Sequence, residues 1–152
     1  MSESDQGASP RAARTAGREL ALQLLYAFEQ NRYKDDGYLL TSDCKDGLDP
    51  TSVQFAAELY QGFIAERIAV DAAVDKRLEN WTLIRLAVCD RNLLRLGAYE
   101  LLYRDDTPAK VAINEYIEMA KKFGSDGKTT KLVNGVLDRI ARDHRTAEIA
   151  KK

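Results

Sequence analysis

The hydrophobic pattern of the chain is helical throughout. Apolar residues recur at spacings of three and four, which places them on one face of an α-helix. No stretch alternates β-branched and aromatic residues with polar ones between turn residues, so the sequence predicts no strands. The first helix is expected over residues 15–30, with Leu20, Leu24, Leu25 and Phe28 on its apolar face. The pattern therefore predicts an all-α fold.

Capping and turn residues divide the rest of the chain into further helices. Asp49-Pro50 and Thr107-Pro108 each predict an N-cap followed by a proline in the first helical turn, and Gly124 predicts a helix end. The short connections are typical of antiparallel neighbours in a helical bundle. One of these helices is apolar around much of its circumference and is expected to be central. The helices expected after the first run over residues 50–68, 74–78, 82–88, 90–104 (the central one), 109–123 and 132–140.

The composition is that of a globular protein. The 152 residues are enough for one domain with a core of its own, and 45% hydrophobic with 31% charged residues agrees with that class. No apolar run approaches the roughly 18 residues that a membrane-spanning helix needs, and the polar, acidic start of the chain is not a secretory signal. We therefore expect a cytoplasmic protein without membrane contact.

Cysteine and histidine chemistry is scarce. Cys44 and Cys89 are far apart and lack CxxC spacing, which indicates neither a disulfide nor a zinc site and agrees with a reducing compartment. His144 is the only histidine, which removes most histidine-based catalytic and metal sites, and it is expected on the surface. The sequence thus predicts no metal, no cofactor and no catalytic residue.

Two motifs resemble chemical sites without completing them. Residues 124–129 end like a phosphate-binding loop, but Lys122 stands where that motif needs a glycine, and no strand precedes it. Glu115 and Glu118 share a helix face at a spacing that could hold a metal with a matching helix, but the chain has no Glu-x-x-His. Solvated or partner-facing carboxylates are the favoured interpretation.

Charge is segregated along the chain, although the formal net charge is only −1. Residues 7–18 hold three arginines and no acid, residues 121–152 hold nine bases and four acids, and residues 33–79 hold five bases and ten acids. RNA-binding surfaces combine such basic groups with aromatic rings that stack on unpaired bases. On the residues alone, a solvated charged face with ordinary core aromatics remains the favoured alternative. The candidates are Tyr26 behind Arg11, Arg14 and Arg18, and Phe123 between Lys121, Lys122, Lys128 and Lys131.

Four ordered blocks of sequence resemble the NusB family of bacterial transcription antitermination factors. Two are similar to the consecutive signatures of that family, and two are similar to its first and central helices. Together the blocks extend over residues 14–139, nearly the whole folded part. They are KVAINEYIEMAKKFG at 110–124, KLVNGVLD at 131–138, LLR and AYEL within 93–101, and Arg18-Glu19 with Ala21 and Leu25-Tyr26.

The resemblance implies a fold and a role. Members of the family form a seven-helix bundle of two helical subdomains, which agrees with the helices that periodicity predicts. They bind the boxA element of nascent ribosomal RNA transcripts together with NusE, a small-subunit ribosomal protein, and the complex helps RNA polymerase to resist termination. The resemblance therefore implies a non-enzymatic protein that binds boxA-type single-stranded RNA and NusE within the RNA polymerase antitermination complex.

Positions that match the binding surfaces of the family can be named in this sequence. Asp90, Glu100 and Glu115 are the candidates for contact with NusE, because that partner is typically basic. As an alternative, Glu100 or Glu115 anchors a buried hydrogen bond. The RNA-binding candidates are Arg14, Arg18, Gln23, Tyr26, Arg91, Arg95, Phe123 and Lys131 by resemblance, joined by Arg11 and Lys128 from the basic ends.

Departures from the family pattern reduce the expected RNA affinity. Thr15 and Ala16 interrupt the basic run before the first helix, and Leu132 stands where an aromatic residue is usual and cannot stack on a base as well. The sequence therefore predicts a weak RNA binder that depends on its protein partner. A protein-only helical adaptor that has lost specific RNA recognition is the alternative function.

The expected organisation is a flexible polar tail over residues 1–13, a helical RNA-binding domain over 14–143 and a basic tail over 144–152. NusB-like domains also occur fused to RNA cytosine methyltransferases, but that activity needs a cofactor domain for which the chain has no room. An enzyme is therefore not expected. The RNA consensus stays open, and the protein is expected to be a monomer or a weak homodimer.

Overall fold

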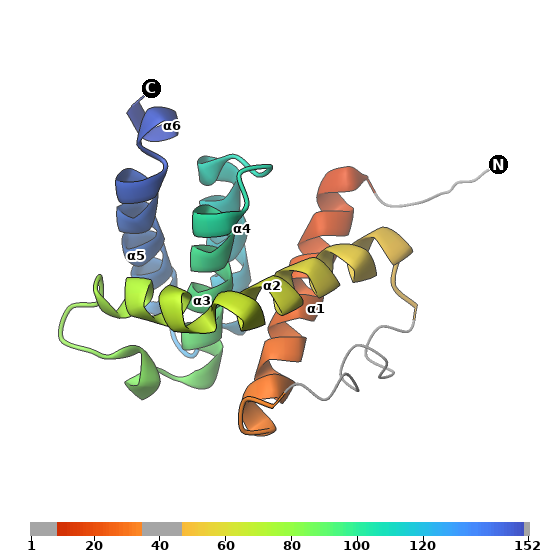
Figure 1. The fold of residues 1–152 in the computed structure, drawn as a ribbon, viewed down its shortest axis with the longest axis horizontal. Helices are drawn as coiled ribbons and strands as arrows, with labels where there is room; N and C mark the ends of the chain where they lie inside the picture. The colour runs from red at the N-terminus through yellow and green to blue at the C-terminus, as the bar shows by residue number, and fades with distance from the viewer. Residues whose placement is uncertain (1–8, 35–46, 151–152) are drawn as a thin grey trace. The chain divides into compact units, whose positions relative to one another are not determined.

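The computed structural model describes residues 9–34 and 47–150, and over those residues the chain is helical with no strand. Its elements follow the order α1, α2, the 3-10 turn η3, α3, α4, α5 and α6 (Figure 1). The chain divides into two compact units, Met1–Gln61 and Gly62–Lys152, which we call the N-terminal and C-terminal units. The predicted all-α class is confirmed. Cys44 and most of the expected N-terminal tail lie outside the described residues.

Helix α1 spans Pro10–Gln30 and begins earlier than the sequence predicted. The Ser9 hydroxyl accepts a hydrogen bond from the Ala12 N–H at 3.1 Å, and the proline occupies the first turn, where no intrahelical partner for an N–H exists. The expected start at Thr15 was therefore wrong, because this cap and proline were assigned to a loose tail. The arginines that follow the proline consequently lie on the helix.

Helix α2 spans Pro50–Asp75 and consists of two helical segments separated by a kink, where the sequence predicted two helices. Its start is as expected, since the Asp49 carboxylate accepts the Thr51 N–H at 2.7 Å. The expected separation into two helices is confirmed, but the break lies at Glu66 and not after residue 68. Glu66 has non-helical backbone angles, φ −111° and ψ 16°, and marks a kink between two helical segments.

Close helix packing holds the N-terminal unit together. The buried Ser52 hydroxyl of α2 donates a hydrogen bond to the Ala13 carbonyl of α1 at 2.7 Å. Gly17 permits this approach, because a Cβ atom there would lie 2.9 Å from the Ser52 carbonyl oxygen and 3.0 Å from Cδ2 of Phe55. The backbones of α1 and α2 are thus nearly in contact at this point.

The C-terminal unit is built around helix α3, Val88–Tyr103. This helix contacts both α4, Ala109–Phe123, and α5, Thr129–His144, which also contact each other. Eleven of its 16 residues are buried, so the expected central position is confirmed. The short helix expected over residues 82–88 is reduced to the 3-10 turn η3, Leu83–Arg85.

Helix α6, Thr146–Ala150, supplies a partner for the start of α4. The first N–H of α4, from Ala109, donates to the Glu148 carboxylate at 2.8 Å. Pro108 takes the N-cap position of α4 and has no capping side chain, so the expected cap by Thr107 was wrong. Part of the segment expected as a C-terminal tail is therefore structural.

Gly17→Ala is expected to lower the free energy of unfolding by about 1–3 kcal/mol, because the added methyl group meets the Ser52 carbonyl and the Phe55 ring. Urea unfolding followed by circular dichroism measures the change. Gly135→Ala in α5 is the matched control, because its Cβ would meet only Nη2 of Arg139 at 4.0 Å and alanine improves helix propensity by about 1 kcal/mol. A Gly17→Ala protein as stable as the control would contradict the close packing.

Candidate nucleic-acid interface

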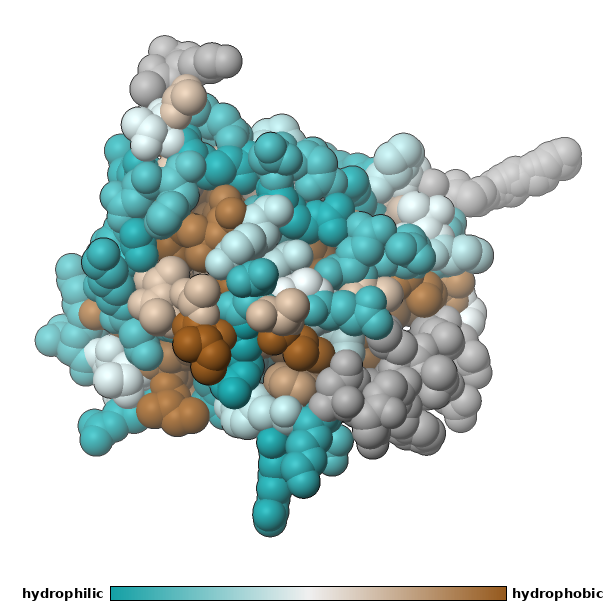
Figure 2. All heavy atoms as spheres, viewed as in Figure 1, coloured by the Kyte–Doolittle hydropathy of each residue, from teal (hydrophilic) through white to brown (hydrophobic). Residues whose placement is uncertain are grey.

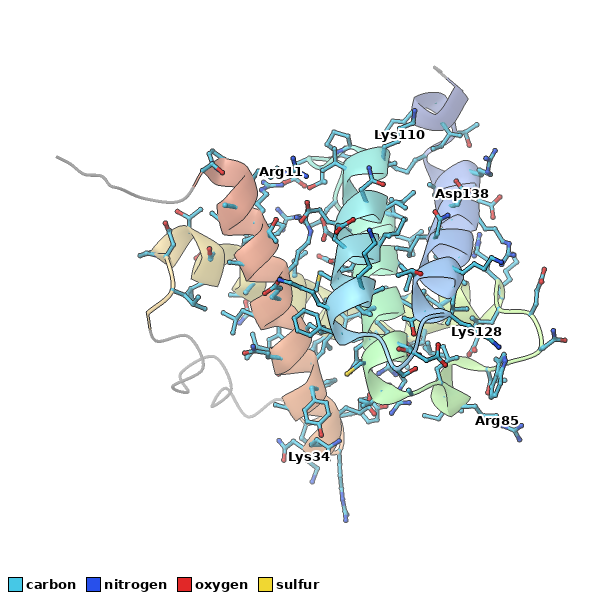
Figure 3. All side chains as sticks on the ribbon, turned by 180° about the vertical axis from the view of Figure 1, so that it is seen from behind. Arg11, Lys34, Arg85, Lys110, Lys128 and Asp138 are labelled. Atoms are coloured by element: carbon cyan, nitrogen blue, oxygen red, sulfur yellow. The ribbon has the colours of Figure 1, made fainter. Side chains whose placement is uncertain are left out.

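Helix α1 carries the exposed RNA-binding candidates of the N-terminal unit. Arg11 and Gln23 are exposed, and the Tyr26 ring is 47% exposed. Gln23 and Tyr26 are neighbours on the helix surface because they are three residues apart, and Arg11 lies near the start of the same helix (Figure 3). These three side chains can therefore reach a ligand without rearrangement of the unit.

Arg14 and Arg18 pack against an aromatic ring. The guanidinium carbon of Arg14 lies 4.6 Å from the centroid of the Phe55 ring, and that of Arg18 lies 5.2 Å from it. Arg18 is only 2% exposed, whereas Arg14 is partly exposed. Cation–π contacts stabilise by about 0.5–2 kcal/mol, so packing accounts for the placement of both side chains. Arg11 is the member of this basic run that lies fully at the surface.

Arg91 and Arg95 of α3 make contacts inside the C-terminal unit. The Arg95 guanidinium donates to both carboxylate oxygens of Asp71 on α2, at 2.9 and 3.0 Å, and is 3% exposed. It also donates to Oδ1 of Asn92 at 3.1 Å. Arg91 is half-buried and donates to the Leu86 carbonyl. Both arginines therefore connect parts of the unit to each other.

The end of α4 presents aromatic and basic side chains to solvent. Phe123, the last residue of the helix, is 38% exposed, and the Lys122 ammonium lies 5.8 Å from the centroid of its ring. Lys128, in the loop that follows, and Lys131, at the start of α5, are exposed as well. Such a group can stack on an unpaired base while the lysines neutralise phosphates.

Asp90 fixes the loop between α4 and α5 to the start of α3. Its Oδ1 accepts hydrogen bonds from the Ser125 N–H at 2.9 Å and from the Thr129 hydroxyl at 3.2 Å. Its Oδ2 accepts one from the Ser125 hydroxyl at 2.6 Å. Asp90 is 6% exposed, and its carboxylate is directed at this loop.

The other two acids expected to face NusE are buried too. Glu100 has no exposed surface, and its Oε2 accepts a hydrogen bond from the Tyr116 hydroxyl of α4. Glu115 is 6% exposed. The alternative in which Glu100 anchors a buried hydrogen bond is thus the arrangement found here.

A groove in the C-terminal unit was not predicted from the sequence. Its volume is about 440 Å³, and its lining includes Trp81, Arg85 and Lys128. Trp81 was not among the candidate residues predicted from the sequence. The signal that could have indicated the groove was the sole tryptophan of the chain, placed outside any apolar helix face and four residues before an arginine.

The described part of the chain holds neither a metal-binding group of side chains nor a membrane-spanning helix. It contains no group of three or more His, Cys, Asp or Glu side chains that could hold a metal ion. None of its helices is long and apolar enough to cross a bilayer. The face seen in Figure 2 is largely hydrophilic, with separate hydrophobic patches. His144 is exposed, as expected.

A comparison with known families covers most of the chain. The model of the NusB family matches residues 15–142. The chain belongs to the NusB family. The four sequence blocks that predicted this membership fall mostly within the matched range, and the prediction is confirmed.

Known NusB proteins are similar to this chain over nearly their whole length. The transcription antitermination protein NusB of Geotalea uraniireducens is 42% identical over 138 residues, which cover 86% of this chain and 94% of that protein. The NusB protein of Myxococcus xanthus is 41% identical over 133 residues, which cover 85% and 94%.

Solved NusB structures share the fold. The structure of T. maritima NusB has a TM-score of 0.78 at 34% identity and covers 95% of this chain and 99% of that one. The crystal structure of the antitermination factors NusB and NusE in complex with dsRNA has a TM-score of 0.77 at 26% identity, covering 87% and 98%. The NusB-type helical class is confirmed, although the described residues form six α-helices and one 3-10 turn where seven helices were expected.

Asp90→Ala is expected to lower the free energy of unfolding by about 2 kcal/mol, because a hydrogen bond to a charged group contributes roughly 1.5–3 kcal/mol and the loop loses its partner. Asp138→Ala on α5 is the matched control, since its ion pair with Arg142 is at the surface and contributes little. Urea unfolding compares the two variants. Equal losses of stability would argue against a loop-fixing role for Asp90.

Proposed function

We propose that this chain is a transcription antitermination factor that binds boxA-type single-stranded RNA of nascent ribosomal transcripts together with NusE. The observation that carries the proposal is membership of the NusB family over residues 15–142. It is supported by relatives named as transcription antitermination proteins and by the fold shared with NusB in a complex with NusE and RNA. The proposed role is binding within an RNA polymerase complex and not catalysis. This role is consistent with the cytoplasmic location expected from the sequence.

The exposed candidates are the side chains that we assign to RNA contact. Lysine and arginine neutralise phosphates and release counterions, which gives salt-dependent affinity. Aromatic rings stack on unpaired bases, which favours single-stranded RNA. The assigned residues are Arg11, Gln23 and Tyr26 in the N-terminal unit, and Phe123, Lys128 and Lys131 in the C-terminal unit.

The remaining arginines are assigned a positioning role. Arg14 and Arg18 hold Phe55 against α1, and Arg95 ties α3 to Asp71 on α2. Removing one partner of a buried ion pair costs roughly 3–5 kcal/mol, so loss of Arg95 would disturb the C-terminal unit. Loss of Arg14 or Arg18 would remove a cation–π contact of about 0.5–2 kcal/mol from the N-terminal unit. We expect Arg91 to act in the same way.

For NusE we propose recognition through the surface around α3 and α4, where Asp90, Glu100 and Glu115 lie. Asp90 and Glu115 each retain a small exposed area, whereas Glu100 has none. Glu100 therefore contributes by fixing Tyr116. In this proposal the three acids stabilise the surface that NusE contacts, and they contribute little exposed area to it.

The central experiment is a titration of boxA RNA and a scrambled RNA, with and without NusE, across a salt series. Arg11→Ala and Lys131→Ala are each expected to reduce the slope of log affinity against log salt by about 0.7, the contribution of one cation to single-strand binding. Lys110→Ala is the matched control, because Lys110 is exposed at the start of α4, far from Lys128 at the other end of the C-terminal unit (Figure 3). Equal affinity for both RNAs under every condition would refute specific boxA binding.

Tyr26→Leu is expected to weaken boxA binding by about 1–3 kcal/mol, the contribution of one base stacked on an aromatic ring. Tyr26→Phe keeps the ring and is expected to bind nearly as well as the unmodified chain. Fluorescence anisotropy of a labelled RNA with NusE present measures both variants. Similar affinities for the two would remove Tyr26 from the RNA surface.

A protein-only adaptor is the second candidate function. It is favoured by the burial of Arg18 and by the packing of Arg14 on Phe55, which reduce the charge available to RNA at the start of α1. This function predicts NusE binding that persists in Arg11→Ala and Lys131→Ala while neither boxA nor scrambled RNA is retained. The titration above separates the two functions.

A further inference from the structure

The groove of the C-terminal unit combines an aromatic side chain with two cations. It has a volume of about 440 Å³, within the range of roughly 300–1,000 Å³ that is typical of small-ligand sites. Trp81 is 57% exposed. Arg85 and Lys128 are exposed at the same end of the unit (Figure 3). Within residues 9–34 and 47–150, neither the Arg85 guanidinium nor the Lys128 ammonium has an acidic partner.

The backbone holds Trp81 in place on both sides. Asn80 precedes it in the left-handed region at φ 70°, which fixes a sharp turn. Leu83 follows it as a buried anchor, and its N–H donates to the Asp75 carboxylate at 2.7 Å. The backbone on both sides of Trp81 is therefore held in place, and the indole extends from it into solvent.

The opposite wall of the groove is the loop that Asp90 fixes. Both oxygens of Asp90 accept hydrogen bonds from this loop or the start of α5. The Asp126 carboxylate accepts the backbone N–H of Lys128 at 2.7 Å through one oxygen. The acids that line the groove are thus engaged in holding its shape, and Leu132 adds an apolar surface.

We propose that this groove takes one unpaired nucleotide of single-stranded RNA. The base stacks on the Trp81 indole, and Arg85 and Lys128 neutralise the phosphates on either side of it. An aromatic ring flanked by cations is the combination with which proteins bind single strands, and a base inside a duplex cannot enter because its faces are already stacked. The inference rests on the proposed function and extends the RNA surface to two residues, Trp81 and Arg85, that the sequence analysis did not assign.

The first test uses the single tryptophan of the chain as a reporter. Incorporating 5-fluorotryptophan into this chain alone gives one ¹⁹F signal, from Trp81, both with and without NusE. Binding of boxA RNA is measured separately by anisotropy of a labelled strand. We expect the ¹⁹F signal to shift in proportion to bound single strand and to stay in place with a duplex of the same sequence. RNA binding without any shift overturns the groove assignment and leaves the proposed function standing, whereas no RNA binding at all overturns both.

The second test measures affinity in variants. Trp81→Leu keeps an apolar side chain and removes the stacking ring, so we expect boxA affinity to fall roughly tenfold. Ile84→Ala is the matched control, because Ile84 is 66% exposed on η3 and does not line the groove. Thermal unfolding by circular dichroism confirms that both variants fold. Unchanged affinity of a folded Trp81→Leu protein overturns the stacking role.

The third test addresses the cations. The double variant Arg85→Ala with Lys128→Ala is expected to reduce the salt slope by about 1.4, twice the value for one cation on a single strand. Lys110→Ala again serves as the control of equal charge type. A salt slope equal to that of the unmodified chain overturns the phosphate-binding role of the groove.

Discussion

The buried polar side chains of α3 constrain the whole C-terminal unit. A helix enclosed on most sides must bury whatever it carries, and burying a charged group without a partner costs several kcal/mol. Arg95 forms an ion pair with Asp71, and Glu100 accepts a hydrogen bond from Tyr116. Asp90 accepts hydrogen bonds from Ser125 and Thr129. Each pair connects α3 to a different part of the unit, so the requirement to satisfy these groups also fixes the relative places of the C-terminal part of α2, α4 and the loop before α5.

The same requirement decides what the binding candidates can do. Sequence shows that an arginine or a glutamate is present, but it does not show whether its partner lies in the protein or in a ligand. Arg95 and Glu100 stand in blocks that identify the NusB family, and both are buried and paired. The sequence did not decide whether Tyr26 and Phe123 belong to the core or to the surface, and the structure places both partly in solvent. Family membership therefore indicates which positions are candidates for binding. The burial of each side chain then indicates whether it can contact a ligand or instead stabilises the fold.

The fold was predictable where periodicity is strong and less so where single residues decide. α4 was predicted to the residue, and the central place of α3 followed from its apolar circumference. The start of α1 was missed because its cap was assigned to a tail, and the break in α2 was placed too late because no Gly or Pro marks it at Glu66. The groove beside Trp81 was missed because it forms between segments that lie far apart in the sequence.

The Glu148 carboxylate at the start of α4 has a consequence for the order in which the protein folds. During synthesis, the first turn of α4 leaves the ribosome with an unsatisfied N–H, and its partner follows 39 residues later. Contacts between distant residues form late, because the intervening chain must first be closed into a loop. The α4 helix therefore reaches its final stability only after α5 and α6 have been made. The last helix of the chain thus contributes to the stability of a helix made well before it during synthesis.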